Sequence, residues 1–133
     1  MRVLIDTNIV LDFLQEREPF VEEAARIFDK VDAGEIEGFI SATTITNIYY
    51  IVQKAAGREV AKNAVAQILS DLQICTVDRS TLQQAVALNF RDFEDAVQYA
   101  CAIAYGVDAI VTRDRAGFTS SEIPVRLPRE ILE

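Results

Sequence analysis

Residues 92–114 read DFEDAVQYACAIAYGVDAIVTRD, a pattern that predicts one helix followed by one strand. Apolar residues recur after Asp95 with the one-sided spacing of a packed helix, and Gly106 ends that helix. Residues 107–111 then have the short apolar character of a buried parallel strand. If the helix runs antiparallel to that strand, as in a right-handed βαβ unit, its first turn lies level with the strand's C-terminal end. We therefore expect Asp95 and Asp114 to meet at one edge of a sheet.

Short apolar segments alternate with helical patterns along the rest of the chain. The expected strands are residues 2–5, 38–40, 73–77 and 124–127. The expected helices are residues 9–14, 21–34, 43–52, 59–72 and 81–88, with a terminal helical turn from Pro128. Residues 43–52 are rich in β-branched residues and tyrosine, but their length, a Ser41 cap and a Gly57 stop favour a helix. This alternation predicts an α/β protein whose parallel sheet is covered on both faces.

The composition indicates one globular domain, residues 1–133, whose chemistry depends on carboxylates. Hydrophobic residues make up 50% of the chain and charged residues 26%, which excludes disorder. The chain has no histidine, which excludes Ser-His-Asp and Cys-His catalysis and most zinc sites. The net charge of -8 argues against a passive nucleic-acid binder, but not against an enzyme that holds its substrate through metal ions. Asp12 and the glutamates within residues 16–23 are expected to form a solvated acidic face.

The chain opens at Met1 in a strand pattern with no apolar signal segment, and its apolar runs are too short to cross a bilayer. We therefore expect a cytoplasmic protein without membrane association. Cys75 and Cys101 both lie in apolar patterns. We expect them to be buried small hydrophobic residues, not a disulfide or a thiolate metal site.

Four polar side chains are expected at the C-terminal edge of the sheet, where parallel sheets bind ligands. Asp6 follows the first strand, Asn47 lies early in the helix after the second strand, and Asp95 and Asp114 join them as argued above. Their carboxylates would repel one another, and Arg113 is the only basic neighbour obvious from spacing. A divalent ion relieves this repulsion, and oxygen ligands favour Mg²⁺ or Mn²⁺. Such an ion polarises a phosphoryl oxygen and activates a bound water.

Each of these residues also has a purely structural alternative. Asp6 and Asp78 can cap the helices that follow them. Asp92, three residues before Asp95, resembles the start of a capping box, and Asp114 can be a turn former. Asp78 provides a contrast, because it also ends a strand but is remote from the others if that strand lies at the sheet margin.

At these residues the chain resembles the PIN domain family, a metal-dependent nuclease fold found among the VapC-type toxins of bacterial toxin–antitoxin pairs. The matching motifs are Val3-Leu4-Ile5-Asp6-Thr7-Asn8, Ser41 to Tyr50, Asp92-Phe93-Glu94-Asp95-Ala96, and Ile110 to Asp114 before Phe118. The resemblance implies a three-layer α/β/α domain with a five-stranded parallel sheet and the first strand central. It implies an endoribonuclease that cuts single-stranded RNA with Mg²⁺- or Mn²⁺-activated water. It also implies a homodimer, silenced by an antitoxin protein laid along apolar helix surface.

The resemblance assigns roles to individual residues. Asp6, Asp95 and Asp114 match the metal-binding acids of the family. Thr7 matches a position whose hydroxyl supports the first acid, and Asn8 is its usual neighbour.

The chain departs from the family pattern at two positions. Asn47 stands where PIN domains commonly carry a glutamate, and an amide oxygen can coordinate metal but brings no charge. Asp92 is a nearby acid that could compensate. Gly117 stands where some relatives place an acid.

Two alternatives to the nuclease remain open at this point. The first is a PIN-like module with little or no activity that works as a binding or regulatory protein, which Asn47 favours. The second is a Mg²⁺-dependent phosphatase-like hydrolase on a similar sheet. It is disfavoured because no Asp-x-Asp pair follows the first strand.

Overall fold

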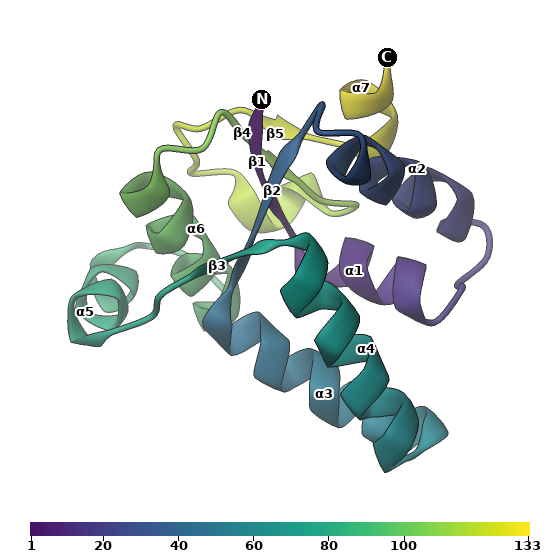
Figure 1. Cartoon of the computed structure of the whole chain (residues 1–133). Helices are drawn as coiled ribbons and strands as arrows, with labels where there is room; N and C mark the ends of the chain where they lie inside the picture. The colour runs from purple at the N-terminus through teal and green to yellow at the C-terminus, as the bar shows by residue number, and fades with distance from the viewer.

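Strand β1 (Arg2–Ile5) lies at the centre of a five-stranded parallel sheet in the computed structural model, which describes residues 1–133 (Figure 1). The strand order is β3-β2-β1-β4-β5, and every neighbouring pair is parallel. The other strands are β2 (Glu37–Ser41), β3 (Gln73–Cys75), β4 (Ala109–Val111) and β5 (Val125–Arg126). Leu4 of β1 pairs with Phe39 on one side and Ile110 on the other. The predicted parallel sheet with the first strand central is confirmed.

Helices cover both faces of this sheet (Figure 1). They are α1 (Thr7–Leu14), α2 (Val21–Asp32), α3 (Ala42–Ala56), α4 (Arg58–Asp71), α5 (Arg79–Ala87), α6 (Phe93–Tyr105) and α7 (Pro128–Leu132), with a 3₁₀ turn, η1 (Arg115–Phe118), after β4. Successive strand residues point to opposite faces, so Val3 and Ile5 pack into a core with α1 to α4, and Leu4 packs into a second core with α6. The result is the predicted three-layer α/β/α arrangement. None of the helices combines the length and the hydropathy that a transmembrane span requires.

Helix α3 forms despite its β-branched residues and tyrosines. The Ser41 hydroxyl accepts a hydrogen bond from the backbone N–H of Thr43 at 3.2 Å and caps the helix. Ile48 and Val52, one turn apart, are both buried in the larger core. The cap and this burial outweigh a weak local propensity, so the predicted helix is confirmed.

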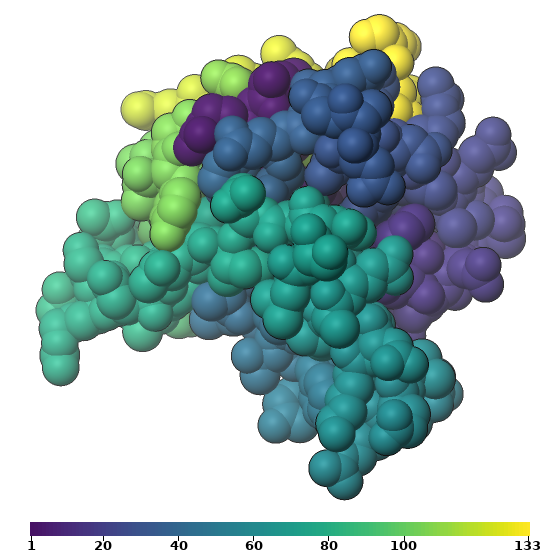
Figure 2. All heavy atoms as spheres, in the orientation of Figure 1, coloured from purple at the N-terminus to yellow at the C-terminus, as the bar shows by residue number.

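The C-terminal ends of the strands lie at one edge of the sheet. β1 leads directly into α1, β2 leads into α3, and β4 leads towards η1. The hairpin of α3 and α4 projects from the body of the molecule, and a hollow separates it from α5 in the space-filling view (Figure 2). This edge is the part of a parallel sheet where ligand sites are expected.

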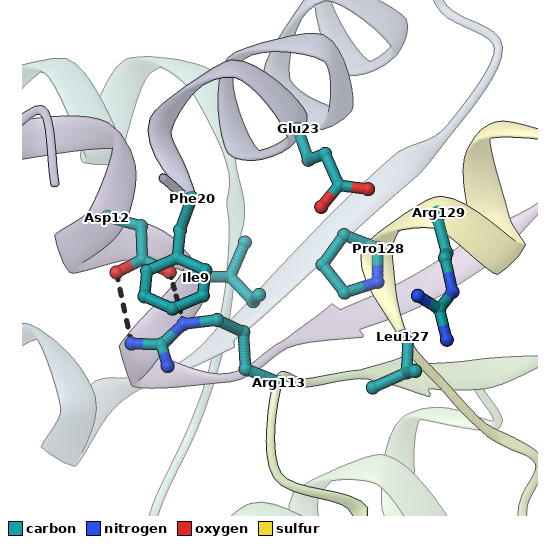
Figure 3. Close-up of a pocket in the computed structure, with 8 residues that line it drawn as sticks. All are labelled: Ile9, Asp12, Phe20, Glu23, Arg113, Leu127, Pro128 and Arg129. Atoms are coloured by element: carbon teal, nitrogen blue, oxygen red, sulfur yellow. Dashed lines mark hydrogen bonds and ion pairs between the residues drawn. The ribbon is translucent and has the colours of Figure 1, made fainter. Parts of the chain in front are cut away.

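Asp12 on α1 is a buried ion-pair partner, so the prediction that it belongs to a solvated face was wrong. Its side chain is 0% exposed, and the guanidinium of Arg113 donates to it from Nε at 2.6 Å and from Nη2 at 3.2 Å (Figure 3). The same guanidinium lies 3.9 Å from the centre of the Phe20 ring. Arg17 Nη1 lies farther from the carboxylate, at 3.8 Å. These two hydrogen bonds between one guanidinium and one carboxylate, here called the fork between Asp12 and Arg113, connect α1 to the segment that follows β4.

Replacing Arg113 by methionine should lower the free energy of unfolding by about 3–5 kcal/mol, because it leaves the carboxylate of Asp12 buried without its main partner. Urea denaturation measures this change. Arg115→Met is the matched control, since Arg115 lies two residues along the chain in an ion pair with Glu130 whose side chains are 50% and 34% exposed. That variant should lose less than about 1 kcal/mol. Equal losses in the two variants would refute the structural role assigned to the Asp12 pair.

Candidate functional site

Asp6 lies at the C-terminal end of β1 and is held by three hydrogen bonds. Its Oδ1 accepts from the backbone N–H of Thr7 at 2.7 Å and from Nε2 of Gln98 at 2.9 Å. Its Oδ2 accepts from the hydroxyl of Thr112 at 2.7 Å. Asp6 therefore caps α1, as the structural alternative predicted, but it also receives two bonds from distant elements. The residue is 6% exposed, and no basic side chain forms an ion pair with it.

Two of these donors connect Asp6 to the other predicted acids. The Nε2 of Gln98 also donates to Oδ1 of Asp95, at 3.4 Å. The hydroxyl of Thr112 also accepts from the backbone N–H of Asp114, at 3.0 Å. Asp6 therefore lies at the centre of the arrangement. Gln98 links it to Asp95, and Thr112 links it to Asp114.

Gln98 has an unusual environment for an amide. The residue is 1% exposed, and its Oε1 is buried without a hydrogen-bond partner, while its Nε2 lies between two carboxylates. Gln98 was not among the residues predicted for the site. The available signal was its position three residues after Asp95, which places both side chains on the same face of a helix.

Asp95 and Asp114 line one small cavity of about 260 Å³, together with Asp92, Arg91 and part of η1. Asp92 caps α6 by accepting from the backbone N–H of Asp95 at 3.1 Å, as its structural alternative predicted. Asp114 caps η1 by accepting from the backbone N–H of residue 116 at 3.2 Å. Gly117 packs against the acid cluster, because a Cβ there would lie 2.6 Å from Oδ2 of Asp95. A larger residue at position 117 would therefore require the Asp95 carboxylate to shift.

The electrostatics show that these acids share one region. The pKa of Asp95 is raised from 3.8 to about 7, first because burial disfavours the charged form and then because of the charges of Asp6, Asp92, Glu94 and Asp114. The predicted repulsion between acids from three segments is therefore present in the folded chain.

Asn47 reaches the same edge but contacts an acid that the sequence analysis overlooked. Its Nδ2 donates to Oε2 of Glu94 at 2.7 Å, and the hydroxyl of Thr7 donates to Oε1 of Glu94 at 2.9 Å. The signal for Glu94 was its place in the first turn of α6, beside Asp95.

Arg113, the only basic neighbour that was obvious from spacing, does not place its charge beside these acids. Its guanidinium is held by Asp12, and only its backbone approaches the predicted site, where its N–H donates to Oδ1 of Asn8 at 3.5 Å. The basic residue that lines the acidic cavity is Arg91. Asp78 behaves as the predicted contrast, because it caps α5 after the edge strand β3.

The donor set fits a hard divalent cation. Asp6, Asp95 and Asp114 offer only oxygen, and none of them forms an ion pair with a basic residue. No group of three or more acidic or thiol side chains is arranged to hold one ion directly. Mg²⁺ usually keeps several waters and needs only one or two carboxylates, so a partly hydrated ion matches the arrangement.

Comparison with known proteins finds a matching family model, a related ribonuclease and several solved structures of the same fold. A family model described as PIN domain matches residues 2–116. Ribonuclease VapC1 of Aquifex aeolicus is 26% identical over 137 residues, which covers 99% of this chain and 94% of that protein. VapC20 of Mycobacterium tuberculosis, described as a Sarcin-Ricin loop cleaving toxin, superposes with a TM-score of 0.75 at 16% identity, covering 93% of this chain and 98% of that one. A toxin-antitoxin complex from Klebsiella pneumoniae gives a TM-score of 0.70 at 24% identity, covering 95% and 97%.

The raised pKa of Asp95 predicts how the stability of the metal-free protein depends on pH. The folded chain binds this proton more tightly than the unfolded chain, so the stabilisation is fully present below pH 3.8 and is lost as the pH rises through about 7. We expect the wild type to lose stability between about pH 4 and pH 7 relative to Asp95→Asn, in urea denaturation with a chelator present.

Asp78→Asn is the control for this titration, because hydrogen bonds from Thr81 lower the pKa of Asp78, which therefore titrates below this range. That variant should keep the pH dependence of the wild type. The same pH dependence in the wild type and in Asp95→Asn would contradict the prediction.

Proposed function

This chain belongs to the PIN domain family, and on that basis we propose that it is a metal-dependent endoribonuclease that cuts single-stranded RNA. The observation that carries the proposal is the network centred on Asp6, in which Gln98 leads to Asp95 and Thr112 leads to Asp114. It gathers uncompensated carboxylates at the edge of the sheet where a substrate can approach. The relative named Ribonuclease VapC1, aligned over nearly the whole chain, supports the reaction class.

The residues of this chain have separable tasks in such a reaction. Bound Mg²⁺ or Mn²⁺ supplies a Lewis acid for a phosphoryl oxygen and lowers the pKa of a water. Asp6, Asp95 and Asp114 would hold the partly hydrated ion, and the hydrogen bonds to Asp6 fix the direction of its lone pairs. Asp114 is exposed and lines the cavity, where it can accept a hydrogen bond from a water. Arg91 lines the same cavity and supplies a cation for an RNA phosphate.

The proposal includes the cellular role of a toxin that an antitoxin protein silences. A solved toxin-antitoxin complex has the same fold, which supports this role. The chain exposes apolar side chains on α3 to α6 that a partner helix or a second copy of the chain could cover. They include Tyr50, Val60, Leu69, Val86 and Ile103. The net charge of -8 suits a basic antitoxin segment. We further propose that the protein is a homodimer and acts in the cytoplasm.

A second candidate is a PIN-like binding module without catalysis, which the amide at position 47 favours. Calorimetric titration with Mn²⁺ separates the two candidates, because the nuclease must bind the ion and the inactive module need not. The absence of Mn²⁺ binding, together with the absence of RNA cleavage, would favour the second candidate.

Asp6→Asn and Asp95→Asn should each reduce Mn²⁺-dependent cleavage of single-stranded RNA to background, because each removes one charge from the ion site. Both variants should keep the circular dichroism spectrum of the wild type. Asparagine at position 6 also caps a helix, and Asp95→Asn removes one of several neighbouring negative charges. Asp78→Asn is the matched control, because Asp78 also follows a strand and caps a helix but lies beyond an edge strand. It should cleave like the wild type. Unchanged cleavage by Asp6→Asn or Asp95→Asn would overturn the proposal.

A further inference from the structure

The acid that the family commonly carries at position 47 is absent, and the structure shows what the residue there does. The Nδ2 of Asn47 donates to Oε2 of Glu94 at 2.7 Å. The side chain of Asn47 therefore lies against a carboxylate from α6. An amide that donates to a carboxylate orients it, which is a positioning task.

A second donor fixes the other oxygen of the same carboxylate. The hydroxyl of Thr7 donates to Oε1 of Glu94 at 2.9 Å, while the backbone N–H of Thr7 donates to Oδ1 of Asp6 at 2.7 Å. One residue thus binds Glu94 and Asp6 at once, which makes Glu94 a neighbour of the central acid. Glu94 is half-buried and has no basic partner in any ion pair.

Asp92, the compensating acid suggested by the sequence, is less suited to this task. It is exposed, and its Oδ1 is engaged in capping α6 through the backbone N–H of Asp95. Glu94 lies one residue from Asp95 on the same helix, and both its oxygens are held by side chains from α1 and α3.

An independent observation indicates that this region accommodates a ligand. The Oε1 of Gln98 is buried without a hydrogen-bond partner, on the amide whose Nε2 lies between Asp6 and Asp95. Most buried acceptors are satisfied, and an ordered water or an ion is one explanation for an acceptor that is not. A partly hydrated cation brings the water donors that such an acceptor lacks.

We propose that Glu94 is the fourth acid of the metal site, supplied from α6 in place of the glutamate that position 47 lacks, with Asn47 and Thr7 as its positioning residues. This inference rests on the proposed function, because it assigns a further residue to the same site.

The test moves the acid between the two helices and measures Mn²⁺ binding to the full chain by calorimetry. Glu94→Gln should weaken the Kd for Mn²⁺ about 10- to 100-fold, as the loss of a supporting group at a metal site commonly does. The double variant Asn47→Glu/Glu94→Gln returns the charge to α3 and should recover the Kd of the wild type to within about threefold. RNA cleavage should follow the same order.

Glu59→Gln is the matched control, because Glu59 is also a glutamate in the first turn of a helix, here α4, and is exposed. It should bind Mn²⁺ like the wild type. The melting temperature without metal should not fall in Glu94→Gln, since that variant keeps an acceptor and removes one of several like charges.

The outcomes separate this inference from the proposed function. If the wild type binds Mn²⁺ and cleaves RNA but Glu94→Gln does so equally well, Glu94 is not part of the site and the nuclease proposal stands. If Glu94→Gln loses binding and the double variant does not recover it, the exchange between positions 47 and 94 is refuted. If the wild type neither binds Mn²⁺ nor cleaves RNA, the proposed function fails, and this inference fails with it.

Discussion

The hydrogen bonds that hold Asp6 are the constraint on which the rest of the site depends. Asp6 begins α1, but its side chain is fixed by Gln98 of α6 and by Thr112 after β4. These bonds join three segments that are far apart in the chain, and they bring a second and a third carboxylate with them. Because the donors are neutral, they orient the charge of Asp6 without cancelling it.

The site therefore carries an electrostatic cost that the fold must offset. Burial and four neighbouring carboxylates raise the pKa of Asp95. The guanidinium of Arg113, which precedes Asp114, is paired with Asp12 and not with these acids. The two apolar cores on either side of the sheet supply the stability that makes this tolerable. Functional sites commonly hold groups in arrangements that the local energetics oppose.

The layout of the fold followed from local patterns, because hydrophobic periodicity and turn residues act over a few positions. The parallel sheet, the helix at α3 and the shared edge of Asp6, Asp95 and Asp114 were all expected on that basis. The pairing of Asp12 with Arg113 was missed because the partners are 101 residues apart. The contact between Asn47 and Glu94 spans 47 residues and depends on which side of two helices meets. Side-chain partners of this kind follow from tertiary packing, which spacing alone does not specify.

The fork between Asp12 and Arg113 has a consequence for anything that docks at the acidic edge. Arg113 stands between Thr112 and Asp114, so fixing its guanidinium on α1 also immobilises the backbone that carries these two residues. Because this segment is already ordered, a ligand that binds there causes little loss of conformational entropy in the protein. Binding at this edge therefore does not require residues 112–114 to be reordered.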